Sequence, residues 1–163
     1  MSFNKDQFES LILDALEPID DVIRVSDSAL NMLLGTAAQE SHFGTYLRQL
    51  GNGPALGVFQ MEPATHDDIW RNFIEYQPGI QAALDGALDG AMAYRGGPQA
   101  ERMAHDLHYA AIMCRIHYYR VPEALPAWND VNALAAYWKE HYNTHLGAGT
   151  VEEFVENYKY YVE

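Results

Sequence analysis

The chain has 163 residues, of which 48% are hydrophobic and 20% are charged, a composition typical of one folded domain rather than a disordered segment. Its 10 Lys and Arg against 23 Asp and Glu give a formal net charge of −13, which argues against nucleic-acid binding because phosphate recognition needs clustered cations. No run approaches the roughly 18 apolar residues of a membrane span, and residues 1–10 lack the apolar region of a signal peptide. We expect a single domain over residues 1–163, with no membrane insertion.

The first part of the chain predicts two helices. Apolar residues at spacings of three and four predict a helix over residues 3–15, which Pro18 would end. A second helix would follow the N-cap residues around Ser26 and end at Gly44 in a left-handed cap.

The middle of the chain is rich in glycine. Residues 46–59 predict a loop, with a small β-hairpin near residues 46–60 as an option. Pro63 would open a helix that runs through Phe73, because proline suits the first helical position. Residues 79–99 predict a short weak helix and a Gly-Gly-Pro turn, a segment that could also form a flap.

The last part of the chain predicts three more helices. Residues 102–120 form the longest helical pattern, with Cys114 expected as a buried small hydrophobe. Residues 132–142 predict another helix, and a capping box at Thr150 opens the last one. The fold class expected from this pattern is mainly α.

Glu40 is the most informative residue for function. Leu33, Ala37 and Glu40 are spaced by four and three, so the carboxyl group should lie beside the buried face of the second helix. Loss of hydration there would raise its pKa toward the range that a general acid needs. The alternative is a fully solvated glutamate at a frayed helix end.

Two later clusters carry side chains suited to a polar ligand. The segment GVFQMEPAT at residues 57–65 follows the glycine-rich loop, and Gln60 within it can donate and accept hydrogen bonds. Tyr142 and Asn143 lie at a predicted helix end and suit sugar hydroxyl and acetamido groups. Taken singly, each cluster is more often a turn or a cap.

In this order the clusters resemble the three motifs of soluble lytic transglycosylases and goose-type lysozymes, members of the lysozyme-like superfamily. That pattern is Glu-Ser, then Gly-Leu-Met-Gln with a following Pro-Ala-Thr, then Tyr-Asn-Ala-Gly. The corresponding residues here are Glu40-Ser41, residues 57–65 and Tyr142-Asn143. The run WKEHYNT that ends at residue 144 is similar to the version in bacteriophage peptidoglycan-degrading proteins.

The resemblance implies a lysozyme-like helical domain that degrades bacterial peptidoglycan, as an endolysin-like muramidase. It would cleave the β-1,4 bond between N-acetylmuramic acid and N-acetylglucosamine, with Glu40 as catalytic acid. Glu62 would be a second catalytic carboxylate that activates water, as in inverting hydrolysis. The substrate-binding residues would be Ser41, by supporting local geometry, with Gln60, Met61, Tyr142 and Asn143.

Several alternatives stay open. Glu62 would otherwise only stabilise the positive end of the helix that begins at Pro63. With Glu40 as the sole carboxylate, the protein would be a lytic transglycosylase of a virion that gives 1,6-anhydro products. It would otherwise be a non-catalytic lysozyme-like module of a phage particle, and chitin is an alternative substrate. The sequence also departs from the family pattern, because Thr144 replaces the alanine of the third motif.

No cofactor and no metal are expected. His141 and His145 are four residues apart and His105 and His108 three apart, but neither pair has the glutamate-containing pattern of a metalloprotease. Trp138 is expected in the core. We expect a monomer that acts on the cell wall, either from the host cytoplasm before lysis or as part of the virion.

Overall fold

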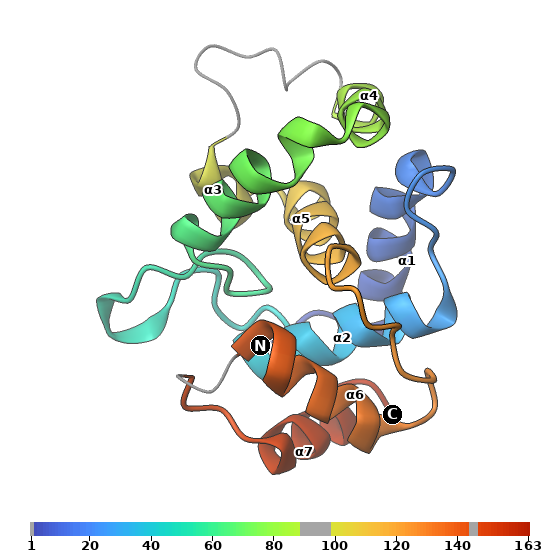
Figure 1. The fold of residues 1–163 in the computed structure, drawn as a ribbon. Coiled ribbons are helices and arrows are strands. Elements are labelled where there is room, and N and C mark those ends of the chain that lie inside the picture. Colours follow the sequence, from blue (N-terminus) through green and yellow to red (C-terminus); the bar gives the residue numbers. More distant parts are fainter. Residues whose placement is uncertain (1, 89–98, 144–146) are drawn as a thin grey trace.

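The structure, a computed structural model, describes residues 2–88, 99–143 and 147–163. In these residues it is mainly helical and has no β-strand, so the predicted fold class is confirmed (Figure 1). The α-helices are α1 (Lys5–Leu16), α2 (Asp27–Ser41), α3 (Pro63–Asn72), α4 (Pro78–Ala87), α5 (Leu107–Tyr119), α6 (Val131–Trp138) and α7 (Val151–Tyr161). The 3-10 turns are Glu17–Ile19, Leu50–Asn52, Ile74–Tyr76 and Ala100–Ala104, and a π-helical turn, η6, spans Lys139–Asn143.

Helix α5 lies at the centre of the molecule (Figure 1). Every residue from Tyr109 to Tyr118 is buried, and a helix buried on all sides needs neighbours on all sides. Helices α1, α2 and α3 supply them, while α2 also packs against α6 and α7. The expected burial of Cys114 and Trp138 is confirmed, since both are fully enclosed. Helix α2 therefore lies between two groups of helices, α1 and α5 on one side and α6 and α7 on the other (Figure 1).

Local capping signals place several helix starts correctly. The Ser26 hydroxyl accepts a hydrogen bond from the Ala29 backbone N–H at the start of α2. Pro63 occupies the first turn of α3, as predicted. Thr150 and Glu153 form the predicted capping box of α7.

The end of α2 differs from the prediction. The helix stops at Ser41, and the left-handed cap is His42 with φ of 48° rather than Gly44. Phe43 also has positive φ, and its fully buried ring packs edge-on against Phe8. Burial of that ring requires the chain to turn early, so tertiary packing overrides the glycine signal.

The prediction of a single helix over residues 102–120 is wrong. A 3-10 turn over Ala100–Ala104 precedes α5, and the chain breaks at Asp106. The Asp106 carboxylate accepts a hydrogen bond from the Tyr109 backbone N–H and pairs with Arg102. An aspartate that caps one helix and binds the arginine before it favours two elements over one.

The other differences concern loops. In place of a hairpin over residues 46–60, the chain forms only two isolated antiparallel bridges, Arg48 with Leu56 and Leu56 with Met61. The helix expected over 132–142 changes to the π-turn η6 after Trp138. Helix α4 accounts for the weak helix predicted after residue 79, whereas the predicted Gly-Gly-Pro turn and flap lie largely outside the described residues. No described helix is long and apolar enough to cross a membrane.

Candidate functional site

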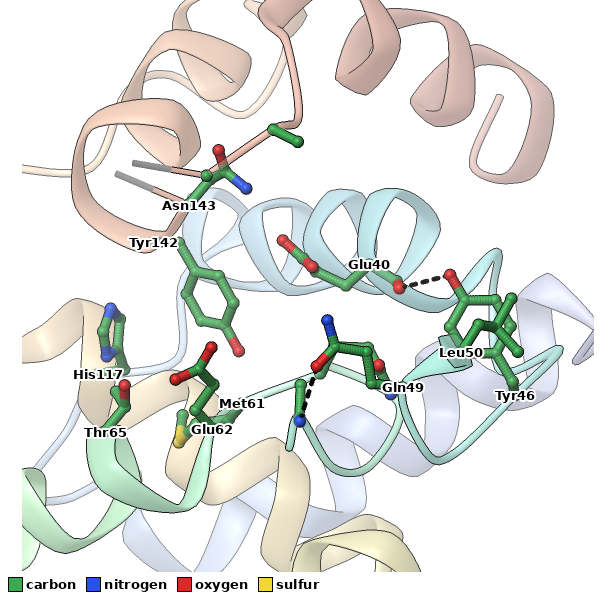
Figure 2. Close-up of a pocket in the computed structure, with 14 residues that line it drawn as sticks. Glu40, Tyr46, Gln49, Leu50, Met61, Glu62, Thr65, His117, Tyr142 and Asn143 are labelled. Atoms are coloured by element: carbon green, nitrogen blue, oxygen red, sulfur yellow. Dashed lines mark hydrogen bonds between the residues drawn. The ribbon is translucent and has the colours of Figure 1, made fainter. Parts of the chain in front are cut away.

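A cleft of about 660 Å³ lies where the end of α2, the loop before α3 and the π-turn η6 meet (Figure 2). Segments far apart in the sequence contribute to it, since the C-terminal end of α2 and η6 are about one hundred residues apart. Six of the seven residues singled out from the sequence line this cleft: Glu40, Gln60, Met61, Glu62, Tyr142 and Asn143. The three motifs therefore form one site.

Glu40 is half-buried on the last turn of α2. Loss of hydration raises the pKa of its carboxyl group from 4.5 to about 7, and a hydrogen bond from Trp138 partly opposes that rise. The Trp138 indole Nε1–H donates to Glu40 Oε1 at 2.9 Å. Within the described residues Oε2 has no hydrogen-bond partner. Glu40 can thus carry a proton near neutral pH, as the helix spacing predicted.

Trp138 makes a contact with Glu40 that the sequence did not reveal. Its indole ring is fully buried and packs against the Phe154 ring, with the centroids 5.4 Å apart. This packing fixes the donor, so one carboxylate oxygen of Glu40 is held in place. Tyr46 adds a second contact, because its hydroxyl donates to the Glu40 backbone carbonyl oxygen at 3.0 Å.

Ser41 does not line the cleft. Its hydroxyl is fully buried, donates to the Ala37 carbonyl oxygen and accepts from the Gly44 backbone N–H. The assignment of Ser41 as a substrate-binding residue is therefore corrected. Its role is to shape the chain reversal after α2, as the geometric part of the prediction stated.

Gln60 belongs to a tight turn that the motif glycine makes feasible. Gly57 has φ of 77°, and a side chain there would collide with the Met103 carbonyl oxygen. Gln60 itself has φ of 47°, and its Nε2–H donates to the Gly57 carbonyl oxygen at 2.8 Å. The side-chain oxygen is left to accept hydrogen bonds from a ligand. Met61 is buried and contributes an apolar surface to the cleft.

Tyr142 and Asn143 are held by the π-turn, a distortion that often marks functional sites. The Tyr142 hydroxyl donates to the Phe59 carbonyl oxygen at 2.7 Å, which ties the third motif to the second. The Asn143 Oδ1 accepts from Lys139 Nζ at 2.7 Å, and Nζ also donates to the Gly147 carbonyl oxygen. The Asn143 amide group is thereby oriented with its N–H donors left for a ligand.

His117 is a cleft residue that the sequence reading missed. It is only 7% exposed, and its imidazole lies edge-on to the Tyr142 ring, with centroids 4.8 Å apart. Burial lowers its pKa to about 4, so the ring is neutral. Because the His141 carbonyl oxygen can only accept, His117 Nε2 carries the proton of their 2.8 Å hydrogen bond. The sequence did contain one indication of this burial: His117 follows Cys114 by three residues, and residues three apart share one face of a helix.

Glu62 lies across the cleft from Glu40 (Figure 2). It is exposed, immediately precedes α3 and makes no side-chain capping hydrogen bond. The site therefore combines one sheltered carboxyl group with one exposed carboxyl group. No group of three or more metal-ligating side chains gathers in the part of the chain that the structure describes, and His145 lies outside it.

No family model, curated protein or solved structure matches the chain. The family resemblance thus rests on the three motifs alone.

Proposed function

We propose that the protein is a peptidoglycan-degrading glycosidase with Glu40 as its general acid. The observation that carries this proposal is a carboxyl group with a pKa of about 7 in a cleft of about 660 Å³. Gln60, Tyr142 and Asn143 line the same cleft and offer polar groups of the kind that bind amides and hydroxyls. The motif order supports a substrate of alternating N-acetylmuramic acid and N-acetylglucosamine.

In the proposed reaction Glu40 gives its proton to the glycosidic oxygen as the bond from that oxygen to the sugar C1 breaks. The ionised Glu40 is then stabilised by the Trp138 N–H. A water molecule attacks C1 from the other face, and Glu62 takes its proton, as in inverting hydrolysis. The Asn143 N–H donors and the Gln60 oxygen complement the carbonyl and N–H of an acetamido group.

The test of Glu40 is the loss of turbidity of purified peptidoglycan. Wild type should clear the suspension, and Glu40→Gln should be slower by about 100- to 10,000-fold, because the glutamine cannot give up a proton. Glu75→Gln, an exposed substitution outside the cleft, is the matched control and should clear at the wild-type rate. Equal clearing by Glu40→Gln would reject the proposed acid, and no clearing by wild type would favour a non-catalytic module.

The nucleophile is identified by mass spectrometry of the released fragments. Attack by water gives reducing ends, whereas ring closure by the substrate's own hydroxyl gives 1,6-anhydro ends. If Glu62 activates water, Glu62→Gln should lower the yield of reducing ends while Glu62→Asp retains part of it. Anhydro products from wild type, unchanged in Glu62→Gln, would instead establish a lytic transglycosylase. Release of fragments from chitin but not from peptidoglycan would change the substrate class.

A further inference from the structure

A second cavity, of about 380 Å³, lies at the other end of α2. Arg24, Ser28 and Arg115 line it together with apolar residues that follow α5. At about 1.5 Å of rise per helical residue, the start of α2 is roughly 20 Å from Glu40. The cavity is therefore separate from the candidate active site, and its chemistry does not depend on the proposed function.

Arg115 is the unusual residue in this cavity. Arg115 is only 6% exposed, yet it forms no ion pair with any described residue. Its Nη2 donates to the Arg24 backbone carbonyl oxygen at 3.0 Å, and its Nε is enclosed without a hydrogen-bond partner in the described residues. Burial lowers the pKa of its guanidinium group. A buried guanidinium that is in no ion pair is costly, so an anion bound at this cavity would stabilise it.

Arg24 adds a second cation at the same place. It is exposed at the cavity and, within the described part of the chain, it has no ion pair either. Two arginines without ion pairs at one cavity are unusual in a chain of net charge −13. By contrast, Arg48, Arg102 and Arg120 each contact a carboxylate. Two guanidinium groups at one cavity create a local positive potential that attracts an anion.

The remaining lining restricts which anion fits. Val121, Pro122 and Leu125 supply apolar surface, so a ligand with an apolar portion is favoured over a bare ion. Glu123 also lines the cavity, and its carboxylate would repel a doubly charged group more than a singly charged one. Planar carboxylates match the guanidinium fork.

We propose that this cavity binds a carboxylate carried by a small apolar group, as at the C-terminus of a peptide. The guanidinium groups of Arg115 and Arg24 supply the counter-charges, and the apolar wall holds the terminal side chain. Arg115 also faces the Tyr119 ring at 5.5 Å, which orients the guanidinium.

The test is an NMR titration of the full chain with acetyl-alanyl-alanine, followed on the backbone amides around the cavity. Saturable shifts there are expected, and the same peptide with an amidated C-terminus should bind at least about tenfold more weakly, because it lacks the charge. Equal binding of the amidated peptide, or shifts confined to other parts of the molecule, would overturn the proposal. Tighter binding of inorganic phosphate than of the peptide would overturn the assignment to a monocarboxylate.

Two variants test whether the arginine at the cavity binds the peptide carboxylate. Arg24→Gln keeps the backbone carbonyl that Arg115 uses and changes only an exposed side chain, so it should fold and bind about three- to tenfold more weakly. Arg71→Gln removes another exposed arginine, one that lies outside the cavity, and this variant should bind the peptide as wild type does. Equal weakening in both variants would mean that net charge alone attracts the peptide, and this result would reject the site.

Discussion

The two sides of the cleft are built differently, although each carries a glutamate. On the α2 side, Glu40 is half-buried, and its carboxylate accepts from a fully buried tryptophan. On the α3 side, Glu62 is exposed and makes no capping hydrogen bond. One fold can therefore hold two carboxyl groups in one cleft in different surroundings, one sheltered and one exposed. The difference comes from the packing around each group, because the side chains are the same.

The largest expected effect concerns the pH dependence of folding. Because the pKa of Glu40 rises from 4.5 to about 7 on folding, the folded state binds the proton more tightly than the unfolded state does. The stability from this group is complete below pH 4.5 and is lost as the pH rises through 7. The loss should reach about 3 kcal/mol, since one pKa unit corresponds to about 1.4 kcal/mol. Glu40→Gln should abolish this loss of stability, so that the variant is more stable than wild type at pH 8.

Urea unfolding at several pH values measures this effect. Glu75→Gln, on the exposed 3-10 turn after α3, should follow the wild-type curve throughout. If Glu40→Gln kept the wild-type loss of stability between pH 4.5 and 7, the carboxyl group of Glu40 would be solvated. The contrast between the two sides of the cleft would then be lost.

The next largest effect is expected from removing the hydrogen-bond donor to Glu40, the indole N–H of Trp138. Trp138→Phe deletes the N–H that lowers the pKa of Glu40, so that pKa should rise above its present value of about 7. Activity that needs protonated Glu40 should then persist to higher pH, and the smaller ring should lower stability by about 1–3 kcal/mol. The pH profile of peptidoglycan cleavage measures the first change and urea unfolding the second.

Trp70→Phe is the control for that substitution. Trp70 donates to the Tyr109 hydroxyl at 3.1 Å, away from the cleft, so its loss should also lower stability. Its pH profile, however, should match that of wild type. A shift of equal size in both variants would mean that the profile reports general destabilisation rather than the hydrogen bond to Glu40.

Some features of the fold and of the cleft could be predicted from the sequence alone. Helix spacing places Glu40 beside a buried face, because residues three and four apart share one side of a helix. Capping residues such as Ser26 and Thr150 identify helix starts from neighbours only a few residues away. These features are local, so the sequence contains what is needed to predict them.

Partners that are distant in the sequence were not predictable in this way. Trp138 could be assigned to the core, but its bond to Glu40 joins residues 98 positions apart and depends on how α6 packs on α2. The break at Asp106 depends on competition between a cap and a continuous helix, which periodicity does not weigh. The acceptor of the His117 proton is the His141 carbonyl oxygen, which lies in the π-turn 24 residues further along the chain.

The smallest expected effect concerns the orientation of Asn143. Lys139→Met removes the donor to Asn143 Oδ1 and to the Gly147 carbonyl oxygen, so the amide would no longer be held with its N–H donors toward the cleft. We expect KM for peptidoglycan fragments to rise by about two- to fivefold while kcat changes little, because the lysine holds a binding group and does not touch the acid. Lys159→Met, an exposed lysine on α7, should change neither constant. A loss of kcat without a change in KM would place Lys139 on the Glu40 side of the cleft and make it part of the acid's environment.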